Sequence, residues 1–329
     1  MAGDGYRVRL ASGATLHGAR VVLAIGNAPR ALPPFLLHPG ARVAEAWDYE
    51  AVRRIPADAD ACILGSGLSM VDAALSLAHG GHRGRIQVLS RHGLLPLAHA
   101  STGPHGGGVD DLLAMGLRER WRELRSRVAA AVAAGEPWQW TFDRLRPHGQ
   151  ALWRSLDAGA RRRFLRHAVR YWDIHRHRIA PQVEAALARL RDSGQLTVVA
   201  GRLRATTIDP GGASHVHYRP RHAAFEARLH ADWIINATGV ETNIDLRPDP
   251  LLRSLREGGL VIPGPLGIGI ATAGIGEAID RRGRPDPRLL VLGAMRIGDL
   301  WESIAIPELR EQARLVAGTI LGAGPVAAR

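Results

Sequence analysis

Apolar or mostly apolar runs that end in glycine recur along the chain. The sequence reads VVLAIG at 21–26, ACILG at 61–65, IINATG at 234–239 and RLLVLG at 288–293. Unbroken apolar runs of this length are typical of strands that are buried on both faces of a parallel sheet. Parallel neighbours need a long crossover, usually a helix, and helical spacing follows the second run. The pattern therefore predicts the α/β fold class.

Residues 57–91 form the clearest unit of this pattern. The strand DACILGSG leads into a helix of about a dozen residues, followed by GGHRG and the strand RIQVLSR. A strand, a helix and a second strand in this order predict a βαβ unit with a right-handed crossover. We expect this unit to begin a Rossmann-like, three-layer domain.

A different pattern occupies about 105–193. Apolar residues there recur at helical spacing, in segments that begin with VDDLLAMG, ALWRSLDAG and PQVEAALARL. The region predicts a helical insertion, and four tryptophans lie in it before Trp172, namely Trp121, Trp138, Trp140 and Trp153. We expect these side chains to pack the insertion onto the sheet domain, with a substrate pocket as the alternative.

Strand patterns return on both sides of this insertion. Residues 6–25 predict a hairpin, in which Tyr6 to Leu10 alternate, ASGAT forms the turn and a second strand follows, and HVHYRP with FEARLH predicts a second hairpin. A final helix is expected where Pro307 suits the first helical position.

The composition favours a globular chain with a substantial core. The chain has 329 residues, of which 46% are hydrophobic, enough for two domains or for one domain with a large insertion. No apolar run reaches the roughly 18 residues of a membrane-spanning helix. No basic segment followed by an apolar one marks a secretory signal. Cys62 is the only cysteine, which excludes an intrachain disulfide and a cysteine-rich zinc site and fits a reducing cytoplasm.

The formal net charge of +12 includes 43 basic residues, all of which are Arg. A coding bias toward Arg explains this, and a surface for nucleic acid is the alternative. Nucleic acid would bind the segment RRRFLRHAVRYWDIHRHR at 161–178, which a solvated helix packed through its apolar residues explains equally. No nucleic-acid motif accompanies the charge, so we expect no such partner. A positive field also attracts phosphate-bearing cofactors.

The glycine turn after the second apolar run carries the main chemistry. Gly65 permits a tight turn, and Gly67 lets the backbone approach a pyrophosphate closely. The helix that follows offers unpaired N–H groups and a partial positive charge. Met70 stands where the usual pattern has a third small residue, and a turn without a ligand is the alternative. The predicted cofactor-binding residues here are Gly65, Ser66, Gly67, Leu68 and Ser69.

The end of the next strand predicts which nucleotide binds. In NAD-binding proteins an acidic residue there accepts hydrogen bonds from the ribose. This sequence has Ser90 and Arg91 instead. An Arg pairs with a 2′-phosphate, which a carboxylate would repel. We therefore predict NADP(H) rather than NAD(H), with a solvated Arg91 as the alternative.

Spacing identifies no metal site and no catalytic residue. His175 and His177 diverge on a helix, and His215 and His217 lack a third ligand. Cys62 lies within a buried strand, where packing is more typical than nucleophilic catalysis. The catalytic acid or base stays unknown.

Several segments together resemble one family. The similarity to bacterial FAD/NAD(P)-binding proteins of the two-dinucleotide-binding flavoprotein superfamily, related to N-hydroxylating flavin monooxygenases, is carried by ILGSGLSMVDAALSLA, RIQVLSRHGLLP, RYWDIHRHRIAP, ADWIINATG and LWESIAIPELREQA. It covers nearly the whole chain. It implies a flavin-dependent oxidoreductase with NADPH as hydride donor and a small-molecule substrate that the sequence does not define. The alternative class is a dinucleotide-binding or redox-sensing module without catalysis.

The resemblance also implies a domain order. In such flavoproteins a first nucleotide motif binds FAD, and a second, inside an inserted domain, binds NAD(P)H. The Gly65 turn corresponds to the second motif, and the first is missing here, so we expect a fragment or a lost FAD site. The implied domains are an incomplete FAD-type domain at 1–56, an NAD(P)-binding domain at 57–238, and a return to the FAD-type domain at 239–329.

The FAD-side residues follow from the same resemblance. Gly26 on one side, and Thr238 with Gly239 on the other, end the strands that connect the two domains. Gly293 ends the last strand, and Pro307 begins a helix whose N-terminus would face the flavin. FAD is thus implied by the family, with an incomplete site. A homo-oligomer is allowed, and a cytoplasmic location is expected.

Overall fold

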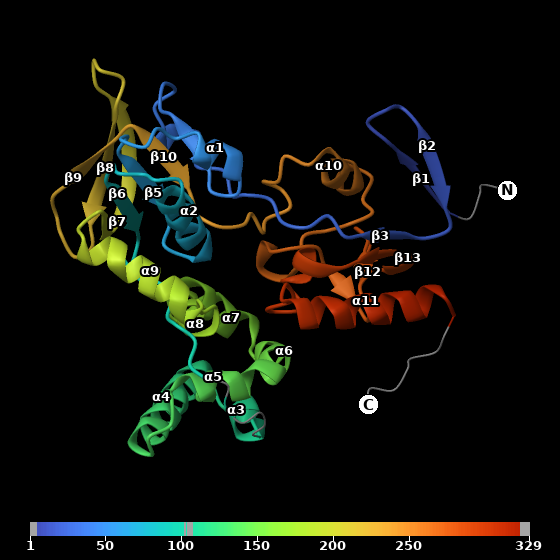
Figure 1. The fold of residues 1–329 in the computed structure, drawn as a ribbon. Coiled ribbons are helices and arrows are strands. Elements are labelled where there is room, and N and C mark those ends of the chain that lie inside the picture. The colour runs from blue at the N-terminus through green and yellow to red at the C-terminus, as the bar shows by residue number, and fades with distance from the viewer. Residues whose placement is uncertain (1–4, 102, 104–107, 323–329) are drawn as a thin grey trace.

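The computed structural model describes residues 5–101, 103 and 108–322, and the expected start of the insertion near 105 lies outside them. Figure 1 shows three parts: a sheet with helices beside it, a cluster of helices below it, and a second sheet formed by the two ends of the chain. Each part has its own hydrophobic cluster.

The strands of the described residues are β1 (Tyr6–Arg9), β2 (Thr15–Gly18), β3 (Val21–Leu23), β4 (Val43–Glu45), β5 (Ala61–Leu64), β6 (Ile86–Ser90), β7 (Leu196–Ile208), β8 (Ser214–Pro220), β9 (Ala227–Ala231), β10 (Trp233–Asn236), β11 (Thr272–Ala273), β12 (Glu277–Ile279) and β13 (Pro285–Val291). Their helices are α1 (Tyr49–Arg53), α2 (Leu68–His79), α3 (Asp110–Ala114), α4 (Leu117–Ala133), α5 (Gln139–Leu145), α6 (Gly149–Arg154), α7 (Ala158–Arg163), α8 (Val169–Arg176), α9 (Pro181–Asp192), α10 (Pro250–Glu257) and α11 (Ile306–Ile320). A π-helical turn, Phe164–Ala168, joins α7 to α8.

A seven-stranded sheet in the order β4-β10-β5-β6-β7-β8-β9 forms the first part. The strands from β4 to the first half of β7 are parallel, and β8 and β9 fold back antiparallel. Ile63 of β5 pairs with Val88 of β6 on one side and with Ile235 of β10 on the other. The chain leaves β5 toward β6 and returns later to β10, so the strand order reverses at β5. Open α/β sheets bind ligands in the crevice at such a point.

Helices cover one face of the parallel strands of this sheet, and the side chains of the β8–β9 hairpin pack against their other face. Successive side chains of a strand point to opposite faces. Ile63 therefore packs beneath α2 and α9, whereas Cys62 faces Val216 of the hairpin side. Leu187 places α9, which the sequence pattern groups with the insertion, against the core of this sheet. The predicted α/β class is confirmed, as a mixed sheet rich in parallel strands.

The insertion is a cluster of helices, α3 to α8, and all of them except α4 have eight residues or fewer, where the sequence pattern predicts longer ones. Gly116 has extended backbone (ψ 161°) and separates α3 from α4, and its N–H donates to the carboxylate of Glu119 (2.9 Å). Asp157 begins α7 by accepting a hydrogen bond from the N–H of Ala160 (2.7 Å). Side chains that satisfy otherwise unpaired N–H groups fix these breaks.

The tryptophans of the insertion pack differently from the sequence expectation. Trp121, Trp138 and Trp153 belong to the insertion's own cluster and not to the core of the seven-stranded sheet. Trp153 also stacks on Trp301 of the C-terminal segment, with ring centres 4.7 Å apart. Trp140 donates to the carbonyl oxygen of Ser101 (2.9 Å). The aromatic contacts therefore join the insertion to the C-terminal segment.

A four-stranded sheet in the order β11-β12-β13-β3 forms the third part. β3 and β13 are parallel, with Val22 opposite Leu290. β3 is the last strand of this sheet, and no described strand pairs with its outer edge. The β1–β2 hairpin lies apart and is joined to β13 by a hydrogen bond from the Tyr6 hydroxyl to Asp286. An open edge at β3 is the feature expected of an incomplete FAD-type sheet.

Throughout the described ranges, no helix is both long enough and apolar enough to cross a bilayer.

Candidate nucleotide-binding site

Gly65 lies where the strand order reverses, directly after β5. Its φ of 111° is a left-handed value that favours glycine. A Cβ at this position would lie 2.2 Å from the carbonyl oxygen of Ala237, just beyond β10. The turn is therefore pressed against the end of the neighbouring strand, and glycine is the residue that fits.

Ser66 and Ser90, two predicted cofactor-binding residues, contact each other. Ser66 Oγ donates to the carbonyl oxygen of Leu94 (2.6 Å) and lies 2.8 Å from Ser90 Oγ. Because a hydroxyl has one proton to donate, Ser90 is the donor to Ser66. Ser90 Oγ also accepts from the N–H of Gly93 (3.0 Å). The two hydroxyls thus fix the glycine turn against the loop after β6.

Gly67 begins α2 with extended backbone (φ −89°, ψ −163°), and no side chain caps this helix end. The first N–H groups of the helix are therefore available to an anion. Among its nearest neighbours, a Cβ on Gly67 would meet only Arg170 Nη2, at 3.9 Å. The missing side chain leaves room between the helix N-terminus and this guanidinium, as a closely approaching pyrophosphate requires.

The next two predicted residues complete the first turn of α2. Leu68 is exposed, and Ser69 Oγ accepts a hydrogen bond from Trp47 Nε1 (3.0 Å). Trp47 follows β4, so this contact ties the helix start to the edge of the sheet. The hydroxyl of Ser69 is used by the protein, and the helix N-terminus offers backbone N–H groups.

Arg91 follows β6 at the same edge of the sheet. Burial lowers the pKa of Arg91, and the charges of Arg170, Arg202 and Arg30 lower it further. The pKa of His92 is lowered by burial and by guanidinium groups nearby. All the charges that perturb Arg91 are positive. This accumulation of positive charge beside the glycine turn favours a phosphate-bearing ligand.

Arg170 of α8 was not singled out from the sequence. Its Nη1 pairs with Asp173 Oδ2 at 3.1 Å, while Nη2 faces the Cβ position of Gly67. Burial raises the pKa of the Asp173 carboxyl, and the charges of Arg170 and His177 act against this rise. Membership of the Arg-rich segment was the only sequence signal for Arg170, since its contact with the turn depends on how the insertion folds.

Other arginines of the segment 161–178 form contacts within the protein. Arg161 lies over the ring of Trp153, 5.2 Å from its centre. Arg176 and Arg178 form ion pairs with acidic side chains of other segments. The packed-helix interpretation of this segment accounts for these contacts.

The predicted residues Gly26, Thr238 and Gly239 lie where the two connectors between the sheets meet. The backbones of 28–30 and 239–241 run antiparallel and exchange two hydrogen bonds of 2.9 Å. Thr238 Oγ1 donates to Asn236 Oδ1 (2.8 Å), and Asn236 Nδ2 donates to the carbonyl oxygen of Arg30 (2.8 Å). These residues shape the junction between the two sheets.

Gly293 and Pro307 lie in the other sheet, where β13 leads to α11. Gly293 has φ of 83°, and its N–H donates to Gln312 Oε1 (3.0 Å). Its carbonyl oxygen accepts from Ser303 Oγ (3.2 Å). Pro307 lies in the first turn of α11, whose N-terminus has no side-chain cap. The structure thus brings the residues of the glycine turn together with Ser90 and Arg91, and it places Gly293 and Pro307 with β13 and α11, which lie beside the other sheet in Figure 1.

The second sheet offers no second nucleotide turn within the described residues. A dinucleotide pyrophosphate is held where a strand passes through a glycine turn into a helix. β3 leads instead into the connector, and β13 leads into a 3₁₀ turn at Gly293–Arg296. The described residues therefore do not complete an FAD site.

The paired histidines of β8 have protein partners. His217 Nε2 lies 2.9 Å from Thr207 Oγ1, and the ring of His215 lies 5.7 Å from that of His230. In the part of the chain that the structure covers, no three His, Cys, Asp or Glu side chains gather as metal ligands.

Solved structures place this fold in a known class. No protein-family model and no curated protein matches the chain. Its structure is, however, similar to flavin-dependent N-hydroxylating monooxygenases, and the resemblance noted from the sequence is confirmed at the level of the fold.

Three of the similar structures show the extent of the match. The ornithine hydroxylase of Pseudomonas aeruginosa, in its reduced form, matches with a TM-score of 0.58 and 17% identity over 97% of this chain and 67% of that one. The L-lysine 6-monooxygenase of Pseudomonas syringae matches with a TM-score of 0.60 and 18% identity over 96% of this chain and 66% of that one. The ornithine N-hydroxylase of Kutzneria sp. 744, with reduced FAD, NADP⁺ and L-ornithine, matches with a TM-score of 0.59 and 13% identity over 96% of this chain and 67% of that one. The chain thus spans about two thirds of the length of these relatives.

Proposed function

We propose that this chain binds NADP(H) at the Gly65 turn. The observation that carries the proposal is the position of Arg170, whose Nη2 lies 3.9 Å from the Cβ position of Gly67 at an uncapped helix N-terminus, with Arg91 close enough to feel its charge. In this arrangement the N–H groups of α2 and Arg170 hold the pyrophosphate across Gly67. Arg91, at the end of β6, holds the 2′-phosphate. When bound, the nicotinamide supplies a hydride, and the chain's residues orient it.

The test is the binding of NADP⁺ and NAD⁺ to the full chain, measured by calorimetric titration. Replacing Arg91 with Ala removes a charged phosphate contact and should weaken NADP⁺ binding about tenfold while leaving NAD⁺ binding within about twofold. Replacing Arg170 with Ala should weaken both, because both nucleotides have a pyrophosphate. Arg282→Ala, in an exposed turn, is the matched control. Equal NADP⁺ affinity in the wild type and in all three variants would refute the site.

We further propose that this site serves a flavin-dependent oxidoreductase. Support comes from the fold shared with flavin monooxygenases and from the Kutzneria enzyme, whose structure contains reduced FAD and NADP⁺. The described residues supply the nicotinamide side and a partial flavin-side sheet. A flavin site then requires a further strand and glycine turn beside the open edge of β3. Flavin absorbance of the purified chain, before and after incubation with FAD, tests this requirement.

A non-catalytic dinucleotide-binding module is the second candidate. One observation favours it: the second sheet lacks a nucleotide turn within the described residues. NADPH oxidation by the chain supplied with FAD and oxygen distinguishes the two. Turnover that requires Arg91 supports the oxidoreductase, and tight NADP⁺ binding without turnover supports the module.

A further inference from the structure

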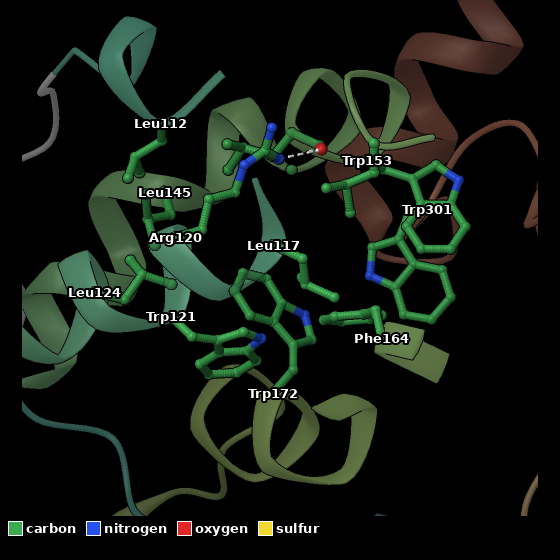
Figure 2. A pocket seen from close by; sticks show the side chains of 13 residues that line it. Leu112, Leu117, Arg120, Trp121, Leu124, Leu145, Trp153, Phe164, Trp172 and Trp301 are labelled. Carbon is green, nitrogen blue, oxygen red and sulfur yellow. Dashed lines mark hydrogen bonds between the residues drawn. The ribbon is translucent and has the colours of Figure 1, made fainter. Parts of the chain in front are cut away.

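A cavity of about 60 Å³ lies inside the helical insertion, where the C-terminal segment closes one side. Figure 2 shows the side chains that surround it, most of them leucines and aromatic residues. All but one come from the insertion, and Trp301 is the exception. The cavity does not include the glycine turn, so its occupant is a different molecule, or a different part of a molecule, from the proposed nucleotide.

Arg120 is the only charged residue that lines the cavity, and four of its five guanidinium N–H groups are already hydrogen-bonded. Its guanidinium donates to three backbone carbonyl oxygens and to Ser155 Oγ, at 2.7 to 3.1 Å. A carboxylate ligand would find only one further guanidinium N–H unless it broke these bonds, and an ammonium ligand would meet a like charge. The lining therefore selects against charged groups.

One polar atom in the cavity wall has no partner. The buried Nε1 of Trp301 makes no hydrogen bond, and it points into the cavity in Figure 2. The two neighbouring indoles differ, since Trp153 Nε1 donates to the carbonyl oxygen of Gly298 (3.1 Å) and Trp172 Nε1 to Glu302 Oε1 (2.6 Å). Buried N–H groups are nearly always paired, so an unpaired one aimed at a cavity indicates an acceptor in its occupant.

Two backbone irregularities hold the cavity's aromatic residues in place. Phe164 begins a π-helical turn, a rare geometry that is frequent at functional sites. Glu302, next to Trp301, has φ of 61°, which is uncommon for a residue other than glycine. Trp172 and Arg176 hold Glu302 in this conformation through its carboxylate. Strained backbone of this kind concentrates at ligand sites.

Water does not suit this space. One water needs at least about 10–15 Å³ and two to four polar partners. The cavity is large enough, but among the buried side-chain polar atoms of its lining that the structure describes, Trp301 Nε1 is the one without a hydrogen-bond partner. An apolar group fills the empty volume and, unlike a water molecule, gives up no hydrogen bonds to bulk water when it enters.

We infer that the cavity binds an uncharged apolar group that carries one hydrogen-bond acceptor, placed against Trp301 Nε1. A small ketone or the carbonyl-bearing aliphatic end of a larger ligand has this chemistry. The inference does not rest on NADP(H) binding, because no lining residue belongs to that site. Either site can therefore fail its test without affecting the other.

The test uses the full chain without cofactor and two probes. Xenon, followed by ¹²⁹Xe NMR, reports the apolar volume, and acetone, followed by ligand-observed NMR titration, reports the acceptor contact. We expect the two probes to compete. Trp301→Phe keeps an aromatic side chain and removes the donor, so acetone should bind about three- to tenfold more weakly while xenon binding is not weakened.

Filling the cavity is the second measurement. Leu117→Trp should lower the affinity of both probes at least about tenfold, and Leu124→Phe serves if the first variant does not fold. Leu246→Trp, at an exposed position, is the matched control and should change neither affinity. If folded wild-type protein binds neither probe, or if the filling variants bind both as wild type does, the cavity is only a packing void and the inference is wrong.

Discussion

Arg176 Nε and Glu302 Oε2 lie 3.0 Å apart and form a buried ion pair between the helical insertion and the C-terminal segment. Their side chains are only 10% and 8% exposed. Trp172 donates to the other oxygen of the same carboxylate. One acidic side chain therefore receives two donors from α8, and the insertion is fixed against the second sheet rather than left to move.

The first prediction concerns this ion pair. Glu302→Gln keeps an acceptor for Trp172 but leaves Arg176 buried and uncompensated, so unfolding free energy should fall by about 3 kcal/mol. Urea denaturation of the full chain measures the change. Glu50→Gln removes one partner of an exposed pair with Arg53 and should alter stability by less than about 1 kcal/mol. An equal, small change in both variants would show that the buried pair does not anchor the insertion.

The two glycines of the turn should fail in different ways. Gly65→Ala places a Cβ against the Ala237 carbonyl and should reduce unfolding free energy by about 3 kcal/mol or more. Gly67→Ala has suitable backbone and free space, so stability should change by less than about 1 kcal/mol. Its methyl group would occupy the space proposed for the pyrophosphate and should weaken NADP⁺ binding about tenfold. Thermal unfolding and NADP⁺ titration separate the two effects; a Gly67→Ala variant that binds normally would contradict the proposed path of the phosphates.

The third prediction concerns the carboxylate beside Arg170. Burial raises the pKa of Asp173 above its usual 3.8, so as pH falls this group loses its charge at a higher pH than an exposed Asp does. Charged Asp173 competes with phosphate for Arg170. At pH values above the raised pKa, Asp173→Asn should therefore bind NADP⁺ about three- to tenfold more tightly than wild type.

The pH dependence provides the control for that variant. The advantage of Asp173→Asn should shrink as pH falls and wild-type Asp173 becomes protonated, while titration of the nucleotide phosphate affects both proteins alike. Calorimetric titrations over a pH series give the ratio of the two dissociation constants. A ratio that stays constant with pH would mean that Asp173 does not control Arg170.

Cys62 supplies a label for global unfolding. The side chain is fully buried in β5, and burial raises the pKa of its thiol to about 12. Because the thiolate is the reactive form, an aromatic disulfide reagent at pH 8 should leave the folded chain unmodified. In urea it should modify one thiol per chain, at a rate that follows unfolding. Fast reaction in native buffer would show that β5 opens locally.

Patterns that local chemistry determines were predicted well from the sequence. The unbroken run before Gly65 became a buried central strand, because apolar residues without alternation require cover on both faces. Gly65 itself was predicted from the turn, and its left-handed φ explains the choice of residue. Ser66 and Ser90 were also placed at one site, although their hydroxyls bind each other and not the crevice.

Contacts between distant segments were not predictable from a single sequence. Arg170 is one of many arginines in its segment, and its approach to the Cβ position of Gly67 depends on how the insertion folds. Trp153 was expected to face the first sheet, yet it stacks on Trp301 about 150 residues away. Helix breaks at Gly116 and Asp157 were missed because apolar spacing continues across them. Capping geometry, rather than hydrophobic periodicity, decides where those helices end.

The pairing of the two connectors has a mechanical consequence. Segments 28–30 and 239–241 are hydrogen-bonded to one another, and the Asn236 side chain bonds the first of them at Arg30 while it also holds Thr238. Two separate strands would act as two independent hinges and would allow the sheets to twist as well as bend. A bonded pair behaves as one ribbon that resists torsion. Motion between the two sheets is thereby reduced to flexing about a single axis.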